Sequence, residues 1–211
     1  MSTLLYITAH PSSPSKSYSL TVGEAFISAY QEAHPEDRVV RLDLYKTDIP
    51  QIDQDVIESW AKLQSGQSFD ELQPNHQKKL EALAHLLDQF CQADKYVFVN
   101  PMWNFSHPPV MKAYIDAICM RGKTFQYTEH GPIGLLNNKK AIHIQACGGI
   151  YTTGPQQDKE IGSRHLQTVL NFIGVTSFDK ILVEGISYTP HLAEEIKTAA
   201  VDQAKEKAKV F

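Results

Sequence analysis

Residues 100–109 combine side chains that suit contact with a flat heteroaromatic ligand. They hold an indole ring, an amide with donor and acceptor, a thioether and rigid prolines, directly after an apolar, β-rich run. The candidate ligand residues there are Pro101, Met102, Trp103, Asn104 and Phe105. Core aromatics and a turn asparagine are the ordinary alternative. We favour a ligand role, because core aromatics usually lie inside periodic elements and ligand loops of α/β sheets lie at strand carboxyl ends.

A second segment, Ser17, Tyr18 and Ser19, follows the first expected strand and begins a helix. Hydroxyl groups, free backbone N–H groups and the helix dipole can together hold a terminal phosphate. Lys16 either adds a charge or stays solvated. A single serine here is explained equally well as a helix cap, so it is the position after the first strand that favours phosphate. Neither GxGxxG nor GxxxxGK[ST] is present, which argues against a dinucleotide fingerprint and a P-loop ATPase.

A third segment, Ala146 to Gly149, ends the fourth expected strand. Its two glycines allow a close backbone approach to a flat ligand and can point N–H groups at its carbonyls, although a simple tight turn is the alternative. Cys147 has no base or resolving cysteine beside it in the sequence, so we expect an inert thiol.

Several classes of function are not supported by the composition. The nine histidines show no HExxH or HxH spacing, and no GxSxG elbow is present, so neither a metal site nor a Ser-His-Asp hydrolase is predicted. A net charge of -4 without a basic run gives no support to nucleic-acid or membrane-surface binding. No apolar run approaches the roughly 20 residues of a membrane span. Three scattered cysteines indicate a reducing compartment, and we expect the cytoplasm.

Alternating strands and helices must position the three segments. Apolar runs predict strands at residues 4–9, 38–44, 95–99, 141–146 and 178–183. Helical spacing is found at residues 20–30, 77–93, 110–120, 161–173 and 191–210. We expect a partly helical excursion at 45–74 and an aperiodic loop at 121–136. Right-handed crossovers then imply a doubly wound α/β parallel sheet of the flavodoxin-like order 2-1-3-4-5, in a single domain of residues 1–211.

Taken together, these segments resemble the FMN-dependent NADH-azoreductases, a family related to the quinone reductases. The resemblance runs nearly end to end. Its most specific parts are Pro-Met-Trp-Asn-Phe at 101–105, Thr-Phe-Gln-Tyr-Thr at 124–128 and Gly-Pro-Ile-Gly-Leu at 131–135. Lys-Lys-Ala-Ile at 139–142, Gly-Gly-Ile at 148–150 and Phe-Ile-Gly at 172–174 continue it.

The resemblance implies an FMN cofactor and a homodimer with two FMN sites at the subunit interface. By position, the phosphate is expected at residues 17–19, the isoalloxazine and ribityl chain along residues 101–105, and the pyrimidine end of the ring at residues 146–149. Phe125 and Tyr127, with Phe172, resemble residues that line the substrate pocket, often supplied by the partner chain.

Two residues depart from the family pattern. His10 stands where a serine is common, next to the expected phosphate, and its pKa would rise beside that dianion. Cys147 stands where related chains often carry arginine. That loss of a cation leaves the flavin potential and the preference between NADH and NADPH open.

The activity implied is a ping-pong transfer of two electrons from NAD(P)H through flavin N5 to a quinone or an aromatic azo compound. The flavin carries this chemistry, so no catalytic side chain is predicted. The alternatives are a flavodoxin-like electron carrier and a regulatory protein of the same fold. Such carriers tend to be shorter and more acidic, and the aromatic segment at 121–136 favours a substrate pocket.

Overall fold

A computed structural model describes residues 1–211, and a five-stranded parallel sheet forms its centre. The strands are β1 (Thr3–Thr8), β2 (Arg38–Asp43), β3 (Lys95–Pro101), β6 (Lys140–Ala146) and β7 (Ser177–Val183). Their order is β2-β1-β3-β6-β7. The expected order of the five strands is confirmed, since the numbering differs only because a hairpin lies between the third and fourth of them.

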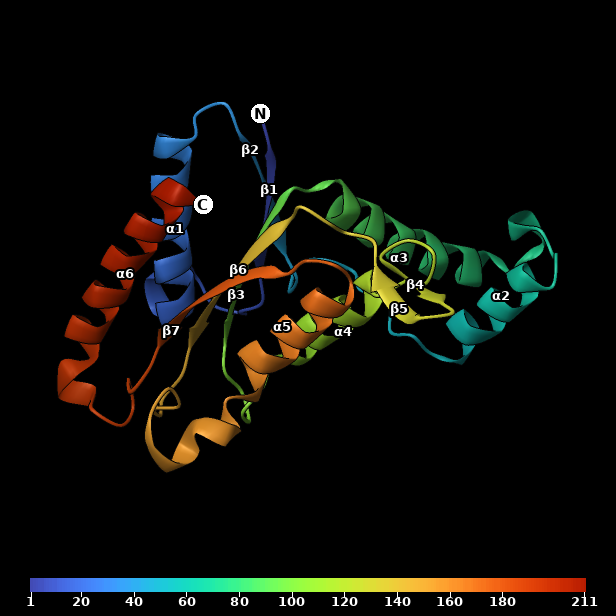
Figure 1. Ribbon diagram of the computed structural model, residues 1–211. Coiled ribbons are helices and arrows are strands. Elements are labelled where there is room, and N and C mark those ends of the chain that lie inside the picture. The colour runs from blue at the N-terminus through green and yellow to red at the C-terminus, as the bar shows by residue number, and fades with distance from the viewer.

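Helices cover both faces of the sheet (Figure 1). One face carries α1 (Tyr18–Ala33) and α6 (Ala193–Val210), and the other carries α3 (Pro74–Gln92), α4 (Pro109–Ile118) and α5 (Ile161–Phe172). The excursion at 45–74 contains a further helix, α2 (Gln54–Gln64), which lies on α3. Short 3₁₀ turns are found at Pro14–Lys16, Phe69–Glu71, Gly154–Lys159 and Pro190–Leu192. None of the helices has both the length and the apolar character that crossing a membrane requires.

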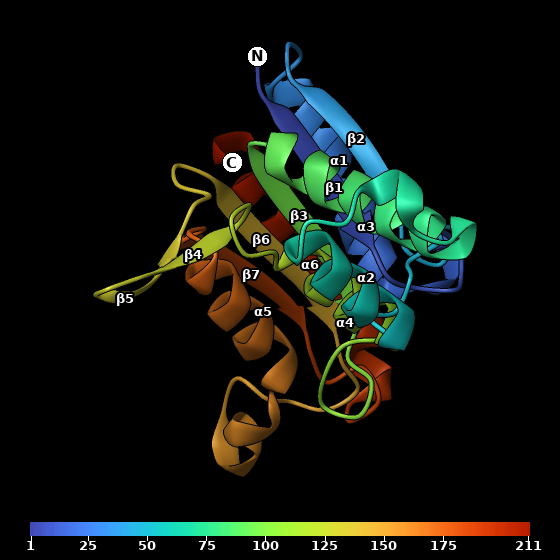
Figure 2. The ribbon, with the colours of Figure 1, turned by 90° about the vertical axis from the view of Figure 1, so that its right-hand side faces the viewer.

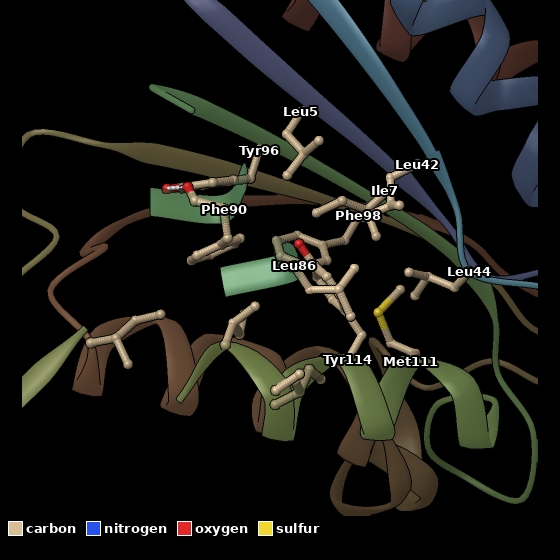
Figure 3. Close-up of a cluster of buried hydrophobic side chains, with 14 of the residues drawn as sticks. Leu5, Ile7, Leu42, Leu44, Leu86, Phe90, Tyr96, Phe98, Met111 and Tyr114 are labelled. Carbon is tan, nitrogen blue, oxygen red and sulfur yellow. Dashed lines mark hydrogen bonds between the residues drawn. The ribbon is translucent and has the colours of Figure 1, made fainter. Parts of the chain in front are cut away.

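Each face of the sheet buries its own hydrophobic cluster. The larger cluster packs Leu5, Ile7 and Phe98 against α3, α4 and α5, and the smaller one packs the opposite side chains of the same strands against α1 and α6. Figure 3 shows part of the larger cluster, in which the rings of Phe90 and Tyr96 stack 4.1 Å apart. Burial on both faces explains why the central strands are continuous apolar runs rather than alternating ones.

The expectation of an aperiodic loop at 121–136 was wrong. These residues form an antiparallel hairpin of β4 (Phe125–Thr128) and β5 (Gly131–Gly134), which projects beyond the sheet (Figure 2). Thr124, fully buried, anchors it by donating a 2.9 Å hydrogen bond to the Ile118 carbonyl. The strands are four residues long and mostly exposed, so they carry no hydrophobic alternation that a sequence pattern could reveal.

Proline marks the start of two helices. Pro74 and Pro109 are the first residues of α3 and α4, where a missing N–H costs nothing. The prolines at 108–109 were expected to start a helix, and that expectation is confirmed. Pro74 was expected to interrupt the excursion at 45–74, but it begins α3 three residues before the predicted start at 77.

Candidate functional site

The carboxyl edge of the sheet holds a cavity of about 260 Å³, here called the edge cavity. It is lined by His10, Lys16, Ser17, Tyr18, Ser19, Pro101, Met102, Ala146, Cys147, Gly148, Ile186 and Ser187. The structure therefore brings together residues from all three predicted segments, which are far apart in the sequence. Segments that follow β1, β3 and β6 meet because parallel strands share a carboxyl edge.

The serine segment both caps α1 and leaves donors free. Ser17 Oγ accepts a long, 3.4 Å hydrogen bond from Leu20 N and lies 3.2 Å from Ser19 Oγ. Both serines are buried, with 5% and 0% of their surfaces exposed. The N–H groups of Tyr18 and Ser19 have no acceptor within the chain. The capping role and a phosphate-binding role are thus compatible, because the cap uses only one lone pair of one hydroxyl.

His10 enters the same cavity as a neutral ring. Its Nδ1 lies 3.0 Å from the backbone N–H of Ser12, which donates to it, so the proton of the neutral ring is on Nε2. Burial lowers the pKa of His10 below its ordinary value. The rise in the pKa of His10 that was predicted from the sequence depends on a bound phosphate. Without one, His10 offers a neutral N–H donor.

The aromatic segment forms a tight hairpin turn beside the cavity. Trp103 and Ser106 exchange backbone hydrogen bonds of 2.9 and 3.0 Å, and the φ angles of Asn104 and Phe105 are 48° and 69°. Positive φ at both central residues is typical of a type I′ turn. Trp103 and Phe105 are 39% and 43% exposed, and neither lines the edge cavity. The Phe105 carbonyl accepts from Ile161 N at 3.1 Å, which fixes the turn to the start of α5.

In the glycine turn, residues 147–149, the two glycines have free N–H groups and carbonyls that accept hydrogen bonds. Gly148 O accepts from Ser187 N and Tyr188 N, both at 3.0 Å, and Gly149 O accepts from Gly185 N at 2.8 Å. The N–H groups of both glycines have no acceptor within the chain. A Cβ on Gly148 would lie 2.8 Å from Ser187 Oγ, so a larger residue there would displace the Ser187 side chain. Gly149 does not line the edge cavity; it lines a neighbouring cavity of about 470 Å³.

Ile186 and Ser187 also line the edge cavity, and the sequence analysis missed them. They follow the fifth strand, β7. The rule that ligand loops lie at strand carboxyl ends, applied to this strand as it was to three others, would have found them.

Cys147 is buried, with 4% of its surface exposed. Burial first, and then the charges of Glu184 and Glu160, raise the pKa of its thiol to about 12. A thiol with such a pKa is not a nucleophile at neutral pH.

A buried polar chain supports the end of β3, and sequence reasoning missed it too. Asn100 Nδ2 donates to the Pro101 carbonyl at 2.9 Å, and Asn100 Oδ1 lies 2.9 Å from His143 Nε2. His143 Nδ1 lies 2.7 Å from Ser163 Oγ on α5. Burial lowers the pKa of His143 well below its ordinary value, so the ring is neutral. These hydrogen bonds connect Pro101, in the wall of the edge cavity, to α5 through side chains that are distant in sequence.

The predicted substrate residues form a separate cluster. The Phe125 ring lies 5.6 Å from that of Tyr127 and 4.6 Å from that of Phe172. None of the three rings lines the edge cavity. Phe172 ends α5, whereas Ile161, whose N–H donates to the Phe105 carbonyl, begins it, and a helix of 12 residues is about 18 Å long.

One further cluster resembles a catalytic arrangement. Ser59 Oγ lies 3.0 Å from His76 Nδ1, and His76 Nε2 lies 3.5 Å from Asp55 Oδ1. Ser59 is fully buried and donates to the Asp55 carbonyl at 2.6 Å, so no substrate reaches its hydroxyl. No group of three or more His, Cys, Asp or Glu side chains is placed to hold a metal ion.

Comparisons with known proteins cover the whole chain. A family model described as the flavodoxin-like fold matches residues 2–208. An FMN-dependent NADH:quinone oxidoreductase of Bacillus velezensis is 54% identical over 211 residues, with 100% of both chains covered.

Two solved structures are similar over nearly their full length. An azoreductase from Bacillus anthracis has a TM-score of 0.93 and 36% identity, with 100% of each chain covered. An FMN-dependent NADH-azoreductase from Bacillus anthracis, in complex with FMN, has a TM-score of 0.91 and 32% identity, covering 98% of this chain and 97% of that one. The similarity therefore includes a protein that holds FMN.

Proposed function

This chain belongs to the family with the flavodoxin-like fold and is similar over its full length to FMN-dependent NADH:quinone oxidoreductases, and we propose that it is itself an FMN-dependent oxidoreductase. It takes two electrons from NADH and passes them to quinones and aromatic azo compounds. The observation that carries this proposal is the edge cavity, where hydroxyl groups and unpaired N–H groups of three loops converge.

The donors present fit the phosphate of FMN. The hydroxyls of Ser17 and Ser19, the N–H groups of Tyr18 and Ser19, and the Nε2 proton of His10 are available to its oxygens. Lys16 lines the same cavity and adds a positive charge. These groups stand at the start of a 16-residue helix, whose dipole favours an anion.

The ring of FMN fits the other walls. Pro101 and Met102 offer an apolar surface, and Gly148, which lines the same cavity, has a free N–H group available to a ring carbonyl. Bound FMN would supply the two-electron chemistry that links NADH to the acceptor in a ping-pong reaction.

No side chain here is suited to acid–base catalysis of that transfer. Cys147 keeps its proton at neutral pH, and His143 is neutral and buried behind the cavity wall. The contribution of the chain is therefore to orient the flavin and exclude water from one of its faces, and we assign no catalytic residue.

The proposal includes a homodimer of a domain that spans residues 1–211. Phe125, Tyr127 and Phe172 form an aromatic cluster with Tyr127 63% exposed, and none of the three lines the edge cavity of its own chain. A second copy would cover these rings and bring them to the partner's flavin. Light scattering of the purified protein tests this, and a monomer at micromolar concentration would contradict it. We assign the protein to the cytoplasm, in keeping with its three free cysteines.

The function is tested by anaerobic spectroscopy of the purified protein reconstituted with FMN. NADH should bleach the yellow flavin, and a small quinone should then restore the absorbance. Steady-state turnover of NADH with that quinone separates an enzyme from an electron carrier, which needs a protein partner. Flavin that stays oxidised with excess NADH would refute the proposal.

A further inference from the structure

We propose, resting on the function proposed above, that Glu160 and Glu184 hold the reduction potential of bound FMN low. Glu160 is hydrogen-bonded to β6, the strand that leads into the glycine turn, residues 147–149, and Glu184 follows β7, whose end is hydrogen-bonded to that turn. There they oppose the negative charge that two-electron reduction brings to the pyrimidine side of the flavin.

Glu160 stands at the start of α5 as a buried carboxylate. Only 4% of its surface is exposed. Its Oε1 accepts from Gln145 Nε2 at 2.9 Å and from Ser163 N at 2.8 Å. Gln145 precedes the turn by two residues on β6 and faces the same side of the strand as Cys147. The carboxylate is therefore attached directly to the strand that ends in the turn, and it also cancels the positive end of the α5 dipole.

Glu184 immediately follows β7, the strand that pairs with β6. Two backbone hydrogen bonds bracket it: Cys147 N donates to Val183 O at 2.9 Å, and Gly185 N donates to Gly149 O at 2.8 Å. Its Oε1 accepts from Tyr151 N at 2.8 Å, so its carboxylate faces the segment that leaves the turn.

Neither negative charge is neutralised by an ion pair. The salt bridges of the structure involve neither Glu160 nor Glu184. Arg164, on α5, directs its guanidinium to the backbone carbonyls of Glu160 and Asp158. The turn itself carries the neutral thiol of Cys147, and both carboxylates act on it, since each raises its pKa.

These charges affect the two redox states of the flavin unequally. The oxidised ring is neutral, whereas the reduced ring gains electron density, so a negative field weakens binding of the reduced form. A tenfold change in the ratio of the two binding constants corresponds to about 30 mV for a two-electron couple. A lower potential makes the reduced flavin a stronger donor to the acceptor.

Glu160→Gln isolates the charge from the hydrogen bonds. Both donors bind Oε1, which glutamine retains, so the cap of α5 and the link to Gln145 are kept. Glu184→Gln is the second variant. Glu206→Gln is the matched control. Glu206 is an exposed glutamate near the end of α6, next to Lys207, which forms a salt bridge with Asp179 on β7. The midpoint potential of bound FMN, measured against a reference dye, and the dissociation constant of oxidised FMN are the readouts.

We expect the ratio of affinities for reduced and oxidised FMN to rise about tenfold in Glu160→Gln, raising the midpoint potential by about 30 mV. Glu184→Gln should raise it in the same direction, and Glu206→Gln should leave it unchanged. If Glu160→Gln does not fold, Glu184→Gln decides alone. If Glu160→Gln and Glu184→Gln fold and bind FMN but leave its midpoint potential unchanged or lower it, the proposal is overturned. Wild-type protein that binds no FMN refutes the proposed function instead.

Discussion

The two edges of the central sheet differ in how completely their polar groups are paired. At the amino edge, the Asp37 carboxylate accepts from the Tyr30 hydroxyl at 2.6 Å and from Ser2 N at 2.6 Å. Lys95 adds a 3.2 Å ion pair to the same carboxylate, and only 11% of the Asp37 side chain is exposed. Every strong donor in this group has an acceptor, so the amino edge is organised for stability.

At the carboxyl edge, donors are held in place without acceptors. Residues 18–19 and 148–149 keep their N–H groups free, while the carbonyls of Gly148 and Gly149 accept hydrogen bonds. Native proteins rarely leave such donors unpaired unless water or a ligand completes them. We therefore expect substitutions at the carboxyl edge to change ligand affinity, and substitutions at the amino edge to change folding stability.

The largest effect is expected from Ser17→Ala combined with Ser19→Ala. Hydrogen bonds to a charged group contribute about 1.5–3 kcal/mol each, so FMN affinity should fall about 100-fold or more. Riboflavin, which lacks the phosphate, should bind as before. Loss of the cap should reduce the free energy of unfolding by about 1 kcal/mol. Fluorescence titration with each flavin measures the first effect, and urea denaturation measures the second.

Ser13→Ala with Ser15→Ala provides the control for that variant. These serines lie in the same segment with hydroxyls 2.9 Å apart, but they are exposed and do not line the edge cavity. Their loss should leave both affinities unchanged. Equal losses for FMN and riboflavin in the first double variant would contradict the phosphate assignment.

The sequence predicted most of the carboxyl edge because the rule involved is local. A ligand loop follows each buried strand, so the order of strands along the chain was enough to place Ser17, Met102 and Gly148 at one edge. The fold followed from the same apolar runs. The hairpin at 125–134 could not be predicted, because its short exposed strands are stabilised by packing on Phe172 and by the anchor of Thr124.

The buried polar groups could not be predicted for a different reason. Asn100, His143 and Ser163 are ordinary residues in the sequence, and their hydrogen bonds join positions 20 and 43 residues apart. Glu160 and Glu184 likewise gain meaning only from the fold, since hydrogen bonds of β6 and β7 bring both near a turn that is distant from them in sequence. Such pairings depend on register, which a single sequence does not encode locally.

An intermediate effect, on stability alone, is expected from Asp37→Asn at the amino edge. The Tyr30 hydroxyl first, and then Ser2 N–H and Lys95, hold the pKa of Asp37 well below its usual range. The carboxylate therefore stabilises the fold above about pH 4, and that contribution is lost as the pH falls further. Asp37→Asn should lower the free energy of unfolding at pH 7 by about 2 kcal/mol, without changing FMN affinity.

Urea denaturation as a function of pH tests this second prediction. The stability difference between wild type and Asp37→Asn should shrink as the pH falls from 5 towards 2, because the wild-type carboxyl becomes protonated. A difference that stays constant over this range, or a loss of FMN affinity in the variant, would show that the two edges are not independent.

The smallest effect is expected from Asn104→Gly, compared with Asn138→Gly. Both asparagines are exposed and left-handed, with φ of 48° and 63°, but Asn104 is two residues from Met102, which lines the edge cavity, whereas Asn138 precedes β6. Glycine keeps this backbone conformation and removes only the amide, so each variant should change the free energy of unfolding by less than about 1 kcal/mol. If the Asn104 amide bonds the flavin ring, only Asn104→Gly should weaken FMN and riboflavin alike, by about five- to tenfold. Equal affinities in the two variants would mean that the turn at 103–106 serves only to position Pro101 and Met102.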